Sequence, residues 1–234
     1  MKNEQRTRRI DGGVTYNRIL EAAGELFATI GFAETTNKMI AARAEVDLAS
    51  INYHFGSRNG LYQAVLVEAH RRLVSVDSLQ QIVAASLSAR EKLKRLIEGL
   101  VKNATVDQSW HVTVLSREFL SPTSHMQALQ KTEIPAKLHF VLEILSELTA
   151  IPTDDPALLR CLISVMAPCA MLLVVGPNIS PLADELHRMP RKVLVEHLFS
   201  FAIAGLEVIG RNHAYQDVHD ASSDRQIRLH EEKL

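Results

Sequence analysis

Hydrophobic residues near the start of the chain recur at the spacing of a helix with one apolar face. They are Ile19, Ala22, Ala23, Leu26, Phe27 and Ile30. This i, i+3, i+4, i+7 pattern predicts a helix that ends at Gly31. We expect two short helices to follow, over residues 36–44 with Thr35 or Thr36 as N-cap, and over residues 48–55.

Longer helical patterns fill the remainder. A helix over 58–76 begins after Ser57, and Ser88 with Glu91 forms the capping box of the next. Further helices are expected over 110–120, 123–150, 155–175 and 190–209. Pro135 should kink or break the second of these, and Gly210 should end the last. No strand pattern appears, so the fold class is all-α, followed by a polar and loose tail.

Composition narrows the class of protein. The chain is 47% hydrophobic and 23% charged, with a net charge of −1, which is ordinary for a globular protein. A basic arm of Lys2, Arg6, Arg8 and Arg9 would either contact phosphates or remain a solvated terminus. Cys161 and Cys169 are two helical turns apart, too far for a disulfide, so we expect reduced thiols in a cytoplasmic protein.

An uncharged stretch over residues 161–183 raises the question of a membrane span. Pro168 and the run of Gly176, Pro177 and Asn178 should cut it into pieces that are too short. A buried core helix is therefore the preferred interpretation.

The two short helices and the tight turn at residues 45–47 have the dimensions of a helix-turn-helix. Apolar side chains of both should pack on Leu26 and Phe27, namely Ile40, Ala41, Val46, Ile51 and Phe55. The second helix would then present Leu48, Ala49, Ser50, Asn52, Tyr53 and His54. Asparagine can pair with adenine, serine is versatile and alanine can touch a thymine methyl. Tyr53, His54 and Arg58 are expected to bind phosphates.

The residues at fixed spacing resemble the signature of the TetR family of transcriptional regulators. They are Arg18 to Ala23, Leu26, Phe27, Gly31, Phe32, Thr35, Thr36, Ile40, Ala41, Val46 and Ile51 to Arg58. The resemblance implies a three-helix DNA-binding domain, a reading helix over 48–54, and Thr36 and Lys38 near the DNA. Glu45 replaces the usual turn glycine, and Asn52 replaces a tyrosine found in many members.

The resemblance also implies a helical-bundle domain that binds a ligand and forms a homodimer. Residues 116–123 are similar to the CecR-like subgroup, which is associated with antibiotic sensitivity and efflux genes. Candidate pocket residues are Trp110, Arg117, Glu118, His125, Met126, His139, Met166 and Cys169. Arg117 and Glu118 are interpreted as a structural ion pair, as part of a solvated face, or as polar anchors for a ligand.

A dimer interface is expected on the two strongly apolar C-terminal helices, over 155–175 and 190–209, which would form a four-helix interface with those of a second copy. The apolar stripe of the last helix consists of Leu194, Leu198, Phe201 and Leu206. The expected domains are 1–57 for DNA binding, 58–210 for ligand binding and dimerisation, and 211–234 for the polar tail. Scattered histidines without a third ligand predict no metal, and we expect neither a cofactor nor an enzyme.

The sequence predicts a repressor that binds a pseudo-palindromic operator as a dimer and is released by a small molecule. Helix 58–76 would link the two domains and act as the lever. Two alternatives stay open: an activator that uses the same helix-turn-helix, and a helical ligand-binding or adaptor protein without a DNA function.

Overall fold

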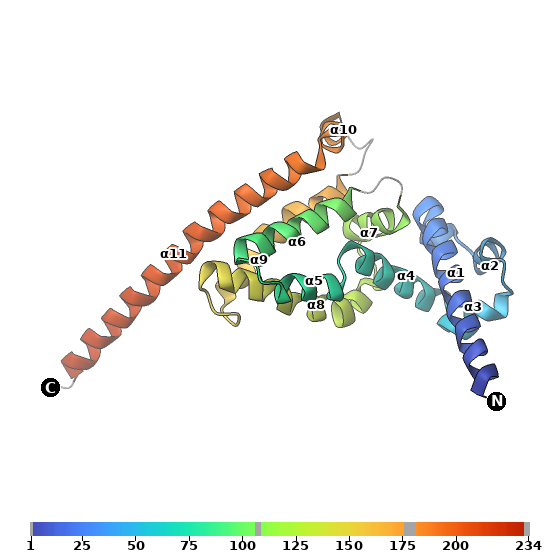
Figure 1. The fold of residues 1–234 in the computed structure, drawn as a ribbon, viewed down its shortest axis with the longest axis horizontal. Coiled ribbons are helices and arrows are strands. Elements are labelled where there is room, and N and C mark those ends of the chain that lie inside the picture. The colour runs from blue at the N-terminus through green and yellow to red at the C-terminus, as the bar shows by residue number, and fades with distance from the viewer. Residues whose placement is uncertain (1, 106–108, 176–180, 232–234) are drawn as a thin grey trace. The chain divides into compact units, whose positions relative to one another are not determined.

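The computed structural model describes residues 2–105, 109–175 and 181–231, which form helices and no strand (Figure 1). This confirms the all-α prediction. The helices are α1 (Lys2–Glu34), α2 (Asn37–Ala44), α3 (Leu48–Phe55), α4 (Arg58–Leu73), α5 (Val76–Ala84), α6 (Ala89–Ala104), α7 (Trp110–Leu120), α8 (Met126–Thr149), α9 (Pro156–Val174), α10 (Pro181–Arg188) and α11 (Arg191–Glu231). The short helices α5 and α10 were not expected from the sequence.

Contacts divide the chain into two compact units. The first comprises residues 1–76, 103–136 and 173–176, and the second comprises 77–102, 137–172 and 177–234. Helix α7 thus belongs with α1 to α4, and α8 is divided between the units just after Pro135. These units show which residues are in contact, and they do not show which segments fold independently. The expected domain limits at residues 57 and 210 therefore remain predictions.

Side-chain caps explain where several helices begin. The hydroxyl of Thr36 accepts a hydrogen bond from Met39 N at 3.3 Å, and that of Ser57 accepts one from Gly60 N at 3.0 Å. Ser88 N donates to the Glu91 carboxylate at 2.9 Å, and Glu91 N donates to Ser88 Oγ at 3.3 Å. These bonds satisfy amide groups that a helix start leaves free, so the predicted caps are confirmed.

Helix α1 extends further than the sequence pattern indicates. It begins at Lys2 and continues to Glu34, with non-helical backbone at Gly31, where φ is 87°. The interruption falls where the sequence predicted the end of the helix, because a positive φ suits glycine. The side chains of the basic arm, residues 2–9, lie outside the described residues.

Gly210 does not end the last helix, contrary to the prediction. Helix α11 continues through it to Glu231. A Cβ at position 210 would lie 2.5 Å from the carbonyl oxygen of Thr149 at the end of α8. The glycine is therefore required by close contact between two helices and not by a turn.

Both internal prolines lie inside continuous helices. Helix α8 continues through Pro135 and α9 continues through Pro168. The expectation that Pro168 divides the apolar stretch was wrong, because a proline removes one backbone hydrogen bond and the turns on both sides remain. Residues 176–180, the second expected break, lie outside the described residues.

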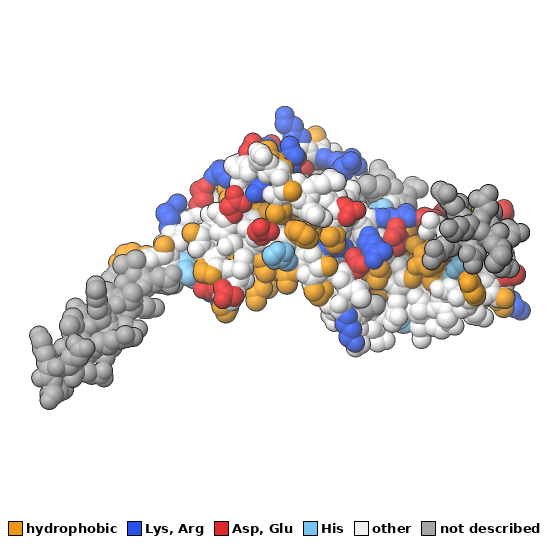
Figure 2. All heavy atoms as spheres, turned by 60° about the horizontal axis from the view of Figure 1, so that its bottom comes forward, with side chains coloured by type: hydrophobic (Ala, Val, Ile, Leu, Met, Phe, Trp, Pro, Cys, Tyr) orange, Lys and Arg blue, Asp and Glu red, His pale blue; other side chains and the backbone are white. Residues whose placement is uncertain are grey.

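The second unit has a buried core and an exposed apolar surface. Leu93, Ile97, Ile144 and Leu158 are fully or almost fully buried, while hydrophobic side chains also reach the surface among charged ones (Figure 2). By length and composition alone, α9 and residues 191–215 of α11 could cross a membrane. Only 33% of the most apolar segment of α9 and 28% of that of α11 are buried inside the protein. Two such helices are weak evidence for a membrane span, because the core helix of a soluble protein passes the same test.

The two thiols are buried and unpaired, as expected. Burial raises the pKa of the Cys169 thiol to about 11 and also raises that of Cys161. Both thiols are therefore protonated at neutral pH.

Gly210→Ala is expected to destabilise the protein by about 1–3 kcal/mol, because the added methyl group overlaps the Thr149 carbonyl. Gly99→Ala is the matched control, since a Cβ there meets nothing within 4 Å and alanine favours helix α6. Thermal unfolding of both variants tests this. Equal melting temperatures would contradict the close-contact role of Gly210.

Candidate nucleic-acid interface

Helix α3 presents most of the predicted reading residues to solvent. Leu48, Ala49 and Asn52 are exposed, and Tyr53 is 85% exposed. Ile51, on the opposite side of the helix, is fully buried. The helix therefore has one face in the core and one free face with hydrogen-bonding and small apolar groups.

Two further predicted DNA contacts, Thr36 and Lys38, lie exposed at the start of α2. Ser50 and His54 are half-buried. The ring of His54 lies edge-on to that of Tyr53, with 5.0 Å between the centroids, and Tyr16 of α1 stacks on Phe55 at 4.6 Å. Tyr16 thus holds the end of α3, a role that the sequence did not reveal.

Arg58 is turned toward the protein and not toward solvent. Its guanidinium donates hydrogen bonds to the carbonyl oxygens of Phe32 and Ala33 and lies over the Phe32 ring, 4.3 Å from the centroid. These carbonyls are at the end of α1, where helix acceptors lack partners. The geometry supports a structural role, so we leave Arg58 out of the proposed DNA-binding surface.

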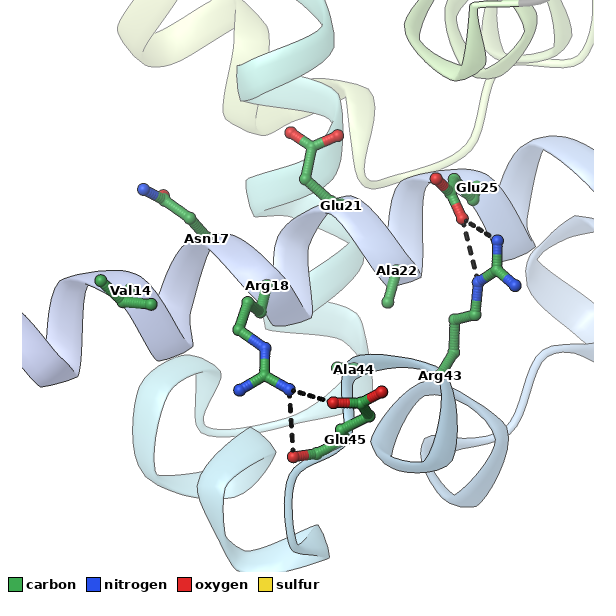
Figure 3. Close-up of a pocket in the computed structure, with 9 residues that line it drawn as sticks. All are labelled: Val14, Asn17, Arg18, Glu21, Ala22, Glu25, Arg43, Ala44 and Glu45. Atoms are coloured by element: carbon green, nitrogen blue, oxygen red, sulfur yellow. Dashed lines mark hydrogen bonds and ion pairs between the residues drawn. The ribbon is translucent and has the colours of Figure 1, made fainter.

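The turn between α2 and α3 contains a left-handed residue other than glycine. Glu45 has φ 51° and ψ 49°. Arg18 of α1 binds it twice, at 3.1 Å to the carboxylate and at 3.3 Å to the backbone carbonyl (Figure 3). The ion pair offsets part of the conformational cost that a non-glycine residue has there.

A shallow groove of about 550 Å³ lies between α1 and the end of α2 (Figure 3). Its two arginines are already bound to carboxylates: Arg18 to Glu45, and Arg43 to Glu25 at 2.7 Å. None of the predicted site residues lines it. We therefore do not assign it to an effector.

Helix α7 is built into the same unit as the helix-turn-helix. A Cβ at Gly24 would lie 2.5 Å from the Trp110 ring, so the indole packs directly on the backbone of α1. Trp110 Nε1 donates to Glu21 at 2.8 Å, and Arg72 of α4 binds Glu21 while lying 4.8 Å over the indole. Burial raises the pKa of Glu21, but hydrogen bonds from Arg72 and Trp110 outweigh it and lower the pKa.

Glu118 joins α7, α4 and the loop before α8. It is 1% exposed and accepts hydrogen bonds from Tyr62 Oη at 3.1 Å, Thr123 N at 2.8 Å and Thr123 Oγ1 at 2.6 Å. Burial and the neighbouring carboxylate raise the pKa of Tyr62, which keeps its proton for this bond. Arg117 donates to the Phe27 carbonyl of α1 at 2.9 Å.

The predicted pocket residues are divided between the two units. Trp110, Arg117, Glu118, His125 and Met126 lie in the first, and His139, Met166 and Cys169 lie in the second. The contacts of Trp110, Arg117 and Glu118 are internal to the first unit, which favours a structural role over that of ligand anchors. The prediction of a solvated face was wrong for Glu118, because this side chain is buried and bound by Tyr62 and Thr123. The His125 ring lies 5.1 Å from those of Phe32 and Tyr62, while His139 is exposed and 3.9 Å from Glu143.

Gly24, Glu21 and Arg72, which hold α7 against α1 and α4, were not singled out for this role from the sequence. A glycine inside a strong helical pattern is a sign of close packing, and Gly24 carried that signal. Among the described residues, no group of three histidine, cysteine, aspartate or glutamate side chains could hold a metal ion.

Two family models match the chain. Residues 19–65 match the model of bacterial regulatory proteins of the tetR family. Residues 89–206, about half of the chain, match the C-terminal domain of the HTH-type transcriptional dual regulator CecR. The chain belongs to the TetR family. The CecR-like C-terminal domain expected from residues 116–123 is also confirmed, and no curated protein matches the sequence.

Solved structures of other transcriptional regulators share this fold. A transcriptional regulator from Pseudomonas aeruginosa PAO1 is 16% identical, with a TM-score of 0.67 over 84% of this chain and 92% of that one. FadR from Bacillus subtilis, solved in complex with stearoyl-CoA, is 16% identical, with a TM-score of 0.66 over 81% and 98%. FadR from Bacillus halodurans is 18% identical, with a TM-score of 0.65 over 81% and 98%.

Tyr62→Phe is expected to destabilise this TetR-family regulator by about 1–3 kcal/mol, because the buried Glu118 carboxylate loses a donor. Tyr53→Phe is the control, since that hydroxyl belongs to an exposed side chain. Denaturant unfolding compares the two. Equal stability of Tyr62→Phe and wild type would show that Glu118 does not depend on this bond.

Proposed function

We propose that the protein is a ligand-responsive repressor that binds a pseudo-palindromic operator as a homodimer. The observation that carries the DNA-binding part is the free face of α3, which lies inside residues 19–65, the segment that matches the model of tetR-family regulatory proteins. A helix of this size fits the major groove and reads base edges with the side chains on its outer face.

The residues proposed to contact DNA are those that the structure leaves accessible at this surface. Asn52 is suited to adenine, Ala49 and Leu48 to a thymine methyl, and the half-buried Ser50 to a polar group of a base edge. Tyr53, Thr36 and Lys38 flank them and are suited to phosphates, which fix position without reading sequence.

Asn52→Ala is expected to weaken binding to the specific operator by ~1–3 kcal/mol and to leave non-specific binding almost unchanged. Gln63→Ala, an exposed amide on α4, is the matched control. The measurement is a titration of labelled operator and of random duplex at one fixed salt concentration. Wild-type operator affinity for Asn52→Ala would remove this residue from the reading surface.

The direction of regulation needs its own test. The C-terminal model that matches is named after a dual regulator, so a reporter assay should score activation as well as repression. Mapping the genomic sites bound by the protein would show whether efflux or drug-sensitivity genes are among its targets, as we propose.

The proposed dimer uses the exposed apolar faces of α9 and α11. Ile163 is 65% exposed and Phe201 is 72% exposed, and Leu159, Met171, Val193 and Val208 are exposed on the same two helices. Two of the four residues first expected there, Leu194 and Leu206, are instead buried inside the protomer, and Leu198 is half-buried. A second copy would remove the exposed faces from water.

Ile163→Glu combined with Phe201→Glu is expected to yield a monomer, because it places charges in the centre of this interface. Leu120→Glu is the matched control, as Leu120 of α7 is 64% exposed and outside the proposed face. Light scattering measures the mass of each. A dimer that persists in the double variant would place the interface elsewhere.

Release by a small molecule requires that the ligand bind one arrangement of the dimer better than the other. The contacts of α7 with α1 and α4 support a route for this coupling, since a shift of α7 would act directly on Glu21, Tyr62 and Phe27. Helix α4, which leads out of the DNA-binding helices, remains the proposed lever.

A further inference from the structure

Asp47 and Ser50 form a hydrogen-bonded pair at the start of α3. Asp47 Oδ1 accepts from Ser50 N at 2.7 Å and from Ser50 Oγ at 2.6 Å. These two bonds hold the pKa of Asp47 below its ordinary value, so the carboxylate is ionised at neutral pH. An ionised carboxylate can only accept, and the hydroxyl is therefore the donor.

The bond to Asp47 leaves the Ser50 hydroxyl able to act only as an acceptor toward any further partner. A hydroxyl has one proton and two lone pairs, and it normally rotates to suit its partner. In this pair the proton is committed to Asp47, and only lone pairs remain for a further partner. Asp47 is exposed, so its second carboxylate oxygen is also an acceptor at this surface.

We propose that Asp47 determines the base preference of the reading helix by making Ser50 an acceptor that selects an amino base and rejects a keto base. The inference rests on the proposed function, because it requires α3 to lie in the major groove. Asp47 is thus a specificity-determining residue that acts mainly through Ser50.

The base edges supply the reason for the selection. Adenine and cytosine present an amino donor in the major groove, at N6 and N4, whereas guanine and thymine present a carbonyl acceptor, at O6 and O4. Facing a carbonyl, the Asp47–Ser50 pair opposes acceptor to acceptor and adds a negative charge. Facing an amino group, it completes a donor–acceptor chain from the base through Ser50 to Asp47.

Three full-length variants separate this role from helix capping. Asp47→Ser removes the carboxylate but keeps a good N-cap, so α3 retains its start. Asp47→Asn removes the charge but keeps an oxygen that accepts the serine proton. Ser50→Ala identifies the base pair that Ser50 faces, because it should change the base preference at that one position of the operator. Melting temperatures confirm that each variant is folded.

The experiment is selection from a random duplex pool at one salt concentration, followed by titration of single-base variants of the enriched site. At the position identified by Ser50→Ala, wild type should bind adenine or cytosine on one strand at least roughly fivefold more tightly than guanine or thymine. Asp47→Ser should lose this preference, because the Ser50 hydroxyl is then no longer committed to a carboxylate and can also donate to a base carbonyl. Asp47→Asn should retain it.

Other results overturn the inference in distinguishable ways. An amino preference that persists in Asp47→Ser, or a keto preference in wild type, removes the role of Asp47 and leaves the proposed function intact. If Ser50→Ala changes no position of an otherwise specific site, Ser50 faces no base. If wild type enriches no sequence at all, the proposed function itself fails.

Discussion

The packing of Trp110 directly on the backbone of α1 at Gly24 determines how the first compact unit, which contains the helix-turn-helix, is assembled. Only glycine leaves room for the indole there, and the indole N–H then reaches Glu21 one turn earlier on the same helix. With α7 placed in this way, Glu118 reaches Tyr62 and Arg117 reaches the carbonyl of Phe27. A helix that follows the helix-turn-helix by some fifty residues thereby becomes part of its core.

Local features of the fold were predictable from the sequence because their causes are local. The caps at Thr36, Ser57 and Ser88 each involve residues within three positions, and apolar periodicity located α3 and α7 at their observed limits. Gly210 and Pro168 were misinterpreted for the opposite reason. Whether a glycine ends a helix or permits a close contact depends on a neighbour, here Thr149, which is distant in sequence.

In the candidate site, too, features with a local cause were predictable, and features that depend on residues distant in sequence were not. The signature residues between Arg18 and Arg58, which lie at fixed distances from one another in the sequence, identified the family and the exposed face of α3. The inward turn of Arg58 was not predictable, because it depends on the free carbonyls at the end of α1. On α11 the predicted apolar stripe mixes the two kinds of residue, because periodicity cannot say which apolar side chains a protomer buries: Leu194 and Leu206 are buried, whereas Phe201 is exposed.

The protonated state of the two buried cysteines has a practical consequence for spectroscopy. Thiol reagents attack the thiolate, so Cys161 and Cys169 should remain unlabelled in the folded protein. A single cysteine introduced on an exposed helix would then be the one reactive position in each copy of the chain. Paired labels on the proposed dimer could serve as a molecular ruler between its two copies of α3, without first replacing any native residue.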